Sequence, residues 1–358
     1  MSLRSSAVTA NFKRLLHAPV WVLGVFGQSK SFVANPLLGN RTLNRLGLHA
    51  ARVAMAHAIT RLRWRRLANT LPPEERTRFA RDGFLVIPNF LTAQDFDALN
   101  DAARALPRTA KTLNLELREN SQGDTLTQRV LIDSAIEGAF PQFRRLLDNP
   151  RFKRLLNFCG ARKKRPLHYV QRIVNGARRG RRDPQKTLHA DTFHPTLKAW
   201  FFLDRVDATR GPFTYVAGSN RLSLARLRWE YQRSVDVAGH TDGYSEKGSP
   251  RISSDELEAL GLGQPQSITV EPNTLVIADT FGFHRRGDAK PGRSRVEIWS
   301  YSRTNPFNPF VGIGSEWAAR LEQRVARAYW QYKDRQAEER GWSSSWHLIP
   351  PEEFRLSG

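Results

Sequence analysis

The first fifth of this sequence lacks acidic residues. No Asp or Glu precedes Glu74, whereas eleven Lys or Arg lie in the same stretch and supply half of the formal net charge of +22. A surplus of this size predicts an anionic partner. The classes that fit are nucleic acid, an acidic membrane and a charged substrate. Charge of this kind says nothing about the fold.

Cysteine and long apolar runs are scarce as well. The single cysteine, Cys159, excludes an internal disulfide and favours a reducing compartment, the cytoplasm. The longest apolar run of the basic stretch, residues 18–27, has about half the length that a bilayer span needs. It has no clear small-residue cleavage site, so we do not expect a secretory signal. Peripheral attachment to the inner face of the cytoplasmic membrane remains compatible with these features.

Residues 1–75 form the first predicted segment, which is basic and helical. Its residues 41–70 show helical spacing, with an apolar side and a cationic side. The apolar side holds Leu43, Leu46, Ala50, Val53 and Trp64, and the cationic side holds Arg45, Arg52, Arg63 and Arg66. Either residues 1–70 lie on an anionic membrane surface, or the helix packs on the main domain and turns its arginines to water. A nucleic-acid arm is disfavoured, because Gly-rich loops, RNP-type aromatics and zinc-finger spacing are missing.

Residues 76–310 form the main predicted domain. A short strand within 82–91 leads to a helix that starts after Thr92 and runs to about residue 105. A second helix, over 140–160, is expected to break at Asn149-Pro150.

Short runs that are β-branched or aromatic, each bounded by turn residues, follow these helices. They lie at 168–174, 198–206, 211–218, 266–270, 273–280 and 295–303. Their spacing predicts a mostly β fold with flanking helices, either an antiparallel barrel or a double-sheet jelly roll. Residues 311–358 form a C-terminal helical extension, with a helix expected over 315–340.

Candidate metal ligands stand in "LHADTFHPTLKAWFFL", residues 188–203. Residues two apart on a strand share one face, so His189 and Asp191 point the same way at a strand end. His284, just after the apolar run 273–280, is the best candidate for a third ligand. Two His and one carboxylate leave three positions open around an octahedral metal, as in the facial triad of non-haem Fe(II) oxygenases.

Other interpretations of this motif stay open. A lone His-x-Asp pair is common by chance. A zinc hydrolase also uses two His and an Asp, but it needs a general base, and no isolated Glu in the sequence suggests itself for this role. His194 competes as a ligand, but it is an odd number of residues from His189 and Asp191 and so would point to the other face of a strand. It also directly precedes Pro195. A non-catalytic basic β-domain that binds membrane or nucleic acid by charge alone is the alternative outside enzymes.

Arg295 is the candidate anchor for a co-substrate. It follows His284 by eleven residues and opens the run "RVEIWSYSR". A buried arginine near an iron site pairs bidentately with a carboxylate, which suits 2-oxoglutarate with its keto acid on the metal. Arg293, two positions earlier and expected on the same face of the strand, is the alternative anchor, and Gln171 is a further cofactor-binding candidate.

The sequence resembles the phytanoyl-CoA dioxygenase family of Fe(II)- and 2-oxoglutarate-dependent oxygenases in the order and spacing of several motifs. "FARDGFLVIPNFLTAQDFDAL" is similar to the family's opening strand and helix, "LHADTFHP" carries the His-x-Asp, and "TLVIADTFGFHRRGDAKPGRSRVEIWSYSR" supplies the distal His and the arginine. "GPFTYVAGSNRLS" is similar to the family's strand and Gly-Ser turn. The resemblance covers roughly residues 76–310.

The resemblance implies a double-stranded β-helix core, a cupin-like jelly roll. It implies that His189, Asp191 and His284 bind Fe(II), that Arg295 anchors 2-oxoglutarate, and that O2 is used to hydroxylate a substrate C–H bond. The sequence departs from the family pattern at Arg286, where a small hydroxyl residue is usual, and at Asn220, which replaces a histidine. The retained Asp191 argues against the halogenating relatives.

The substrate is predicted from charge. "ARKKRP" (161–166) and "RRGRRDPQK" (178–186) place cations near the metal strand, where they attract phosphate or carboxylate groups or form a solvated loop. Those expected to border the entrance are Arg178, Arg179, Arg181, Arg182 and Lys186. The stretch around His189 looks most like bacterial enzymes that hydroxylate the acidic sugar Kdo on lipid A. A small soluble metabolite or an acyl-CoA is the alternative substrate.

Overall fold

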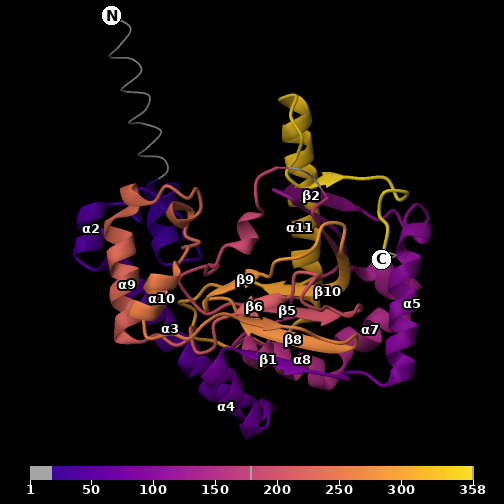
Figure 1. Ribbon diagram of the computed structural model, residues 1–358, viewed down its shortest axis with the longest axis horizontal. Coiled ribbons are helices and arrows are strands. Elements are labelled where there is room, and N and C mark those ends of the chain that lie inside the picture. Colours follow the sequence, from indigo (N-terminus) through magenta and orange to yellow (C-terminus); the bar gives the residue numbers. More distant parts are fainter. Residues whose placement is uncertain (1–17, 178–179, 357–358) are drawn as a thin grey trace, which may run out of the picture.

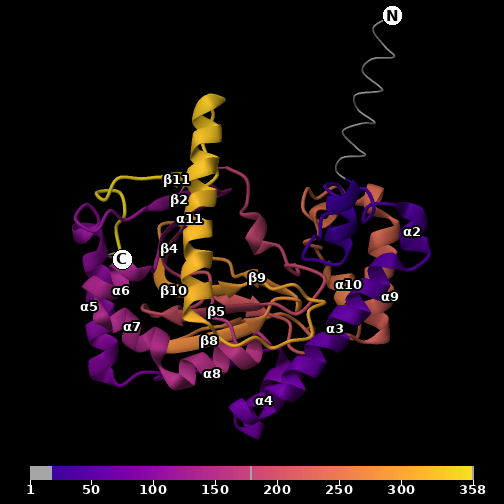
Figure 2. The ribbon, with the colours of Figure 1, turned by 180° about the vertical axis from the view of Figure 1, so that it is seen from behind.

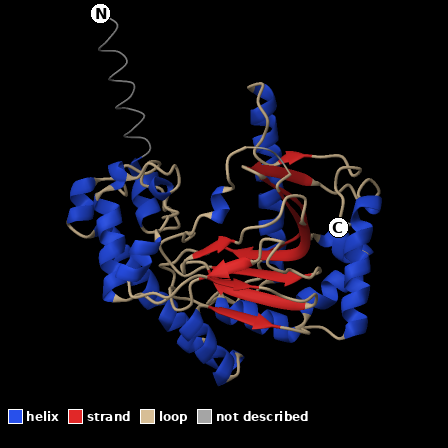
Figure 3. Ribbon diagram, viewed as in Figure 1, coloured by secondary structure: helices blue, strands red, loops and turns tan. Residues whose placement is uncertain are grey.

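Two antiparallel sheets form the centre of the molecule in the computed structural model, which describes residues 18–177 and 180–356. The larger sheet contains β1 (Phe84–Ile87), β2 (Arg118–Gln122), β3 (Thr125–Leu131), β4 (Leu167–Asn175), β5 (Leu197–Phe202), β8 (Thr274–Asp279), β10 (Ser294–Ser302) and β11 (His347–Leu348). The smaller sheet contains β6 (Phe213–Tyr215), β7 (Gln266–Ile268) and β9 (His284–Arg286). The strand orders are β1-β8-β5-β10-β4-β3-β2-β11 and β7-β6-β9 (Figures 1 and 3). The predicted fold class is confirmed, and each of the six predicted strands is present.

Alternation along β5 separates two environments. Ala199 and Phe201 point into the main core under the helices, whereas Trp200 points toward the smaller sheet. The ring centroid of Trp200 lies 4.4 Å from that of Phe213 on β6. Side chains of the two sheets therefore meet in an inner layer, and the polar residues of the site described below share this inner face.

Helices cover the outer face of the larger sheet. They are α4 (Pro73–Asp82), α5 (Ala93–Thr109), α6 (Ser134–Ala139), α7 (Pro141–Asp148) and α8 (Pro150–Cys159). The predicted cap of α5 is confirmed, because the Thr92 hydroxyl accepts a hydrogen bond from the Asp95 N–H at 3.2 Å. The predicted break at Asn149-Pro150 is confirmed too, since Asn149 ends α7 and its side chain caps α8. The sequence did not predict β2 and β3, which are polar on both faces.

A second group of helices forms a lobe beside the sheets (Figure 2). It contains α2 (Arg41–Arg45), α3 (Leu48–Arg66), α9 (Leu224–Val235), α10 (Ser254–Ala259) and the helical residues 18–25. Gly47, with a φ of 95°, breaks the predicted helix 41–70 into α2 and α3. Short 3₁₀ turns lie at η1 (Ala68–Thr70), η2 (Pro184–Lys186), η3 (Val237–Gly239) and η4 (Ser245–Lys247).

The N-terminal helix α3 packs on α9, but not through the face that the sequence predicts. Arg52 and Arg63, expected in water, are buried. Arg52 donates to the carbonyls of Val25 at 2.8 Å and Ser29 at 2.7 Å, and Arg63 donates to that of Asn308 at 3.0 Å. The prediction fails here because loop carbonyls without secondary-structure partners require donors, and these two arginines supply them.

The C-terminal segment is more than a helical extension. The helix predicted over 315–340 is confirmed as α11 (Glu316–Glu339), and β11 then pairs with β2 at the edge of the larger sheet. In the part of the chain that the structure describes, every helix is too short or too polar to span a bilayer.

Candidate metal centre

Backbone pairing between two distant segments brings His189 and His284 together. The His189 N–H donates to the His284 carbonyl at 3.0 Å, and the His284 N–H donates to the His189 carbonyl at 2.9 Å. Residues paired in this way lie directly opposite each other, so their side chains leave on the same side. The two imidazole centroids are 4.6 Å apart.

Asp191 completes a triangle with these two rings. Its Oδ1 lies 3.8 Å from the Nε2 atom of His189 and 3.8 Å from that of His284. All three candidate ligand atoms lie within 4.8 Å of one another. The centre of such a triangle is about 2.2–2.5 Å from each corner, close to the length of N and O bonds to divalent transition metals.

Both imidazoles are oriented for metal binding by their second nitrogen. His189 Nδ1 contacts the Thr187 carbonyl at 2.7 Å, and His284 Nδ1 contacts the Gly282 carbonyl at 2.9 Å. Each Nδ1 therefore carries the proton, and the lone pair is left on Nε2. The two Nε2 atoms are buried and have no hydrogen-bond partner in the described chain. Because unpaired buried polar atoms cost stability, a divalent cation fits this triangle.

The ionisation states of the cluster suit a cation. Burial and the neighbouring His284 hold the pKa of His189 well below its usual range, and burial lowers the pKa of His284 to about 4. Burial opposes the charge on Asp191, but Lys198 and the two imidazoles outweigh it and hold the pKa of Asp191 well below its usual range. At neutral pH the cluster thus offers two neutral imidazoles and one carboxylate, the forms that bind metals.

Lys198 determines which oxygen of Asp191 is available. Its Nζ lies 2.6 Å from Oδ2, which leaves Oδ1 directed at the imidazoles. Lys198 lies on β5 two residues before Trp200, so both side chains share the inner face of the sheet. Lys198 was not among the predicted site residues, although its spacing of two from Trp200 in "LKAWFFL" indicates that both side chains share one strand face.

The local structure around the His-x-Asp pair differs from the prediction. His189 makes isolated bridges to His284 and Arg251, and bends at residues 191–194 separate the pair from β5. The pair is thus not the end of the strand that follows it. His194 lies outside the cluster, and its Nδ1 contacts the Pro195 carbonyl at 3.1 Å.

The N-terminal region supports the segment that carries Asp191. Lys30 Nζ donates to the Asp191 carbonyl at 2.5 Å, and burial lowers the pKa of this lysine to about 8. Two residues on, the Arg52 guanidinium lies 4.2 Å above the ring of Phe193, which also packs on Val53 of α3. The basic segment therefore contributes directly to the position of a predicted ligand.

A cavity of about 210 Å³ lies beside the cluster on the inner face of the larger sheet. His189, His284, Lys198, Gln171 and Arg295 are among its lining residues. Two predicted ligands, His189 and His284, thus share one space with two predicted cofactor-binding residues, Arg295 and Gln171.

Arg295 is fixed in that cavity by three hydrogen bonds. Its Nε donates to Glu297 at 2.8 Å, and its Nη1 donates to the carbonyls of Gly211 at 2.6 Å and Arg210 at 3.0 Å. Within the described chain only Nη2 has no hydrogen bond, so this nitrogen stays free to donate to a carboxylate. Glu297 also accepts from Gln171 at 2.8 Å, a buried link that the sequence analysis missed.

Arg293 does not share this environment. The strand β10 begins at Ser294, and Arg293 is exposed outside it. Its predicted place on the same strand face as Arg295 is wrong, because the chain is still turning after Gly292, whose φ is 77°.

The structure describes only some of the cations that were predicted to border the entrance. Arg178 and Arg179 lie outside the described residues. Arg181 and Arg182 are exposed, whereas Lys186 is buried in an ion pair with Asp124 at 2.6 Å. The cations of 161–166 are not near the cavity, since Arg162 donates to the carbonyls of Asn305, Asn308 and Phe310 in another part of the surface.

Two imidazoles and a carboxylate that converge beside a cavity between antiparallel sheets are the ligand set of the non-haem iron oxygenases that use 2-oxoglutarate. The sequence match points to the same class. Residues 79–253 match the model of the phytanoyl-CoA dioxygenase (PhyH) family, so just under half of the chain is similar to this family. This match and the ligand set together indicate Fe(II), 2-oxoglutarate and O2 as cofactors. The match includes His189 and Asp191 and ends before His284.

Solved structures match this chain only at low similarity. The epimerase SnoN from nogalamycin biosynthesis is 19% identical over 63% of this chain and 81% of its own, with a TM-score of 0.39. EctD from S. alaskensis is 16% identical over 65% of this chain and 76% of its own, with a TM-score of 0.40. HygX from Streptomyces hygroscopicus is 20% identical over 65% of this chain and 88% of its own, with a TM-score of 0.40. Similarity this low supports no conclusion about substrate. No curated protein matches the sequence.

The contact between Lys30 and Asp191 can be tested by replacing the lysine. Lys30→Met removes the donor to the Asp191 carbonyl and loosens a segment that carries a ligand. We expect the affinity for Mn(II), measured by calorimetry on the full chain, to fall by about tenfold, because 1.4 kcal/mol corresponds to this factor and one charged hydrogen bond contributes as much.

Lys247→Met, at an exposed lysine, is the matched control and should bind Mn(II) like the wild type. Equal affinities for the Lys30→Met variant and the wild type would show that the N-terminal region does not position Asp191.

Proposed function

We propose that the enzyme hydroxylates a C–H bond of an anionic, membrane-linked substrate, with the Kdo sugar of lipid A as the candidate. In this reaction 2-oxoglutarate and O2 are converted to succinate and CO2 while the substrate C–H becomes C–OH. The bound iron would supply the oxidising chemistry. His189, Asp191 and His284 would hold the iron, and Arg295 would hold the distal carboxylate of 2-oxoglutarate.

The observation that carries the anionic substrate is Arg129, on β3. This arginine is 7% exposed, lines the cavity, and forms no ion pair with any described carboxylate. Its guanidinium lies 3.6 Å from the ring centroid of Trp346 and 4.6 Å from that of Tyr169. A buried cation held by aromatic faces but lacking a counter-ion is well suited to receive a carboxylate or phosphate from a ligand.

The remaining cavity wall supports the same proposal. Arg285 and Arg286 also line it, but each already has an acidic partner, Asp288 at 3.0 Å and Asp183 at 2.6 Å. No Asp or Glu is among the described lining residues. The cavity is therefore positive overall and favours negatively charged groups. Arg286, which departs from the family pattern, adds to this charge.

The alternatives differ in what they predict for the cavity. An acyl-CoA or a small acidic metabolite would also use Arg129 but would need no membrane. A non-catalytic β-domain would use neither the cluster nor the cavity, and the converging Nε2 atoms disfavour it.

The co-substrate anchor can be tested by comparing two neighbouring arginines. Arg295→Leu removes the cation and its free Nη2 donor from the cavity, so the KM for 2-oxoglutarate should rise by at least tenfold. Succinate formation measures this. Arg293→Leu, at the exposed neighbour, should leave the KM within about twofold. A raised KM for 2-oxoglutarate in Arg293→Leu with an unchanged KM in Arg295→Leu would instead identify Arg293 as the anchor.

The substrate can be tested with purified Kdo-lipid A, a Kdo-free lipid A, and an acyl-CoA. We expect Kdo-lipid A to stimulate succinate formation and to gain the mass of one oxygen atom. Arg129→Gln should raise the KM for this lipid at least tenfold while the KM for 2-oxoglutarate stays unchanged. Arg108→Gln, at an exposed arginine of α5 away from the cavity, is the control and should behave like the wild type.

Succinate formation that ignores Kdo-lipid A, together with an unchanged lipid mass, would contradict the Kdo proposal. Stimulation by the acyl-CoA alone would replace the membrane-linked substrate by a soluble one.

A further inference from the structure

The C-terminal helix α11 turns its large apolar side chains outward. Trp317, Leu321, Val325 and Tyr329 follow one another at intervals of four, and Tyr332 lies on the same side. Their exposures are 73%, 43%, 59%, 53% and 53%. We call these five residues the α11 outer face. No other element covers α11 on the viewer's side in Figure 2.

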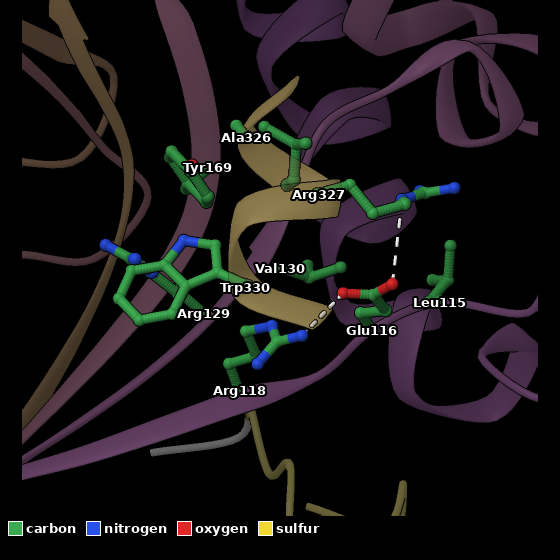
Figure 4. Close-up of a pocket in the computed structure, with 10 residues that line it drawn as sticks. Leu115, Glu116, Arg118, Arg129, Val130, Tyr169, Ala326, Arg327 and Trp330 are labelled. Atoms are coloured by element: carbon green, nitrogen blue, oxygen red, sulfur yellow. Dashed lines mark hydrogen bonds and ion pairs between the residues drawn. The ribbon is translucent and has the colours of Figure 1, made fainter. Parts of the chain in front are cut away.

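The opposite side of α11 is attached to the sheet by polar contacts. Arg327 forms ion pairs with Glu116 and Asp133, and Gln323 donates to the Ile132 carbonyl at 3.2 Å. Figure 4 shows Arg327 reaching Glu116 while Trp330 extends toward Arg129. Apart from Trp330, the helix thus turns polar and small residues inward and leaves its large apolar ones in water, the reverse of an ordinary surface helix.

Cations outnumber acids beside the α11 outer face. Arg320, Arg324, Lys333 and Arg335 are exposed. The acids between them, Glu322 and Asp334, are half-buried in ion pairs with Lys164 at 2.8 Å and Arg118 at 2.9 Å. Exposed acids lie only at the two ends of the helix, at Glu316, which pairs with Arg165 at 2.9 Å, and at Glu338 and Glu339. The surface is therefore apolar in the middle and mainly cationic along its borders.

This combination favours one occupant over the others. A second copy packed antiparallel on the α11 outer face would bring Arg320 and Arg324 of both copies together in the middle of the contact, where the described helix has no exposed acid to pair them. A nucleic acid would use the cations but gain nothing from Leu321 and Val325. An anionic lipid surface accepts both, with apolar and aromatic side chains at the headgroup boundary and cations at the phosphates.

We infer that the α11 outer face docks the enzyme on an anionic membrane. The flanking chain extends the surface, because Phe310 and Ile313 before α11 and Trp342 after it are exposed as well. This inference rests on the membrane-linked substrate of the proposed function and assigns the docking to the C-terminal helix, not to residues 1–70.

Docking through α11 also places the lipid surface close to the substrate cavity. Trp330 comes from the inner side of α11, and the Arg129 guanidinium lies 5.6 Å from its ring centroid. Arg129 and Trp346 in turn line the cavity beside the metal cluster. The helix that contacts the lipid thereby contributes to the residues around the proposed anion site.

Vesicle sedimentation with the full chain tests the inference. We expect the wild type to bind vesicles that contain phosphatidylglycerol and to bind pure phosphatidylcholine vesicles at least tenfold more weakly. The double variant Leu321→Asp, Val325→Asp should lose at least tenfold in binding to the anionic vesicles. Leu224→Asp, at an exposed leucine of α9, is the matched control and should bind like the wild type.

Two further measurements make the test decisive. Leu23→Asp with Phe26→Asp changes exposed apolar residues of the N-terminal lobe, and a loss of binding in this variant alone would overturn the assignment to α11. Sedimentation velocity that shows a dimer abolished by Leu321→Asp would overturn it in favour of a second copy.

Failure of docking and failure of the proposed function are distinguishable. Detergent-dispersed Kdo-lipid A needs no docking, so the double variant should still hydroxylate it at the wild-type rate. Loss of turnover on the dispersed lipid would show that the substitutions damage the enzyme itself and would remove the support for docking.

Discussion

The pairing of the His189 and His284 backbones is the contact on which the site depends. It places two imidazole nitrogens in the interior, where neither has a hydrogen-bond partner in the described chain, and Asp191 adds a carboxylate that Lys198 keeps ionised. Such a cluster is unfavourable without a cation, because buried polar atoms need partners. The sheets, the N-terminal helices and the cavity can all be understood as holding this cluster in place for a metal.

The regions outside the family match are part of the working enzyme. Lys30 and Arg52 tie the N-terminal region to the segment that carries Asp191, and Trp330 ties α11 to Arg129. The strong positive charge is therefore divided among several tasks. Some cations satisfy loop carbonyls, some hold ligands in place, and those around Arg129 and α11 are the ones that we propose to meet an anionic partner.

Much of the architecture could be predicted from local patterns. β-Branched and aromatic runs bounded by turn residues predicted β4, β5, β8 and β10. The Thr92 cap predicted the start of α5, and Asn149-Pro150 predicted the break between α7 and α8. The supporting contacts could not be predicted, because they join residues far apart in the chain. Nothing local to Lys30 indicates Asp191, and nothing local to Arg63 indicates the Asn308 carbonyl. The polar strands β2 and β3 carry too little alternation to be recognised.

Calorimetric titration with Mn(II) and then 2-oxoglutarate tests the central claim most directly. The wild type should bind one metal ion per chain and bind 2-oxoglutarate only when the metal is present. Asp191→Ala and His284→Ala should each weaken metal binding at least a hundredfold, whereas His194→Gln should bind like the wild type. Unchanged metal affinity in the Asp191→Ala and His284→Ala variants would contradict the assignment of this cluster as the metal centre.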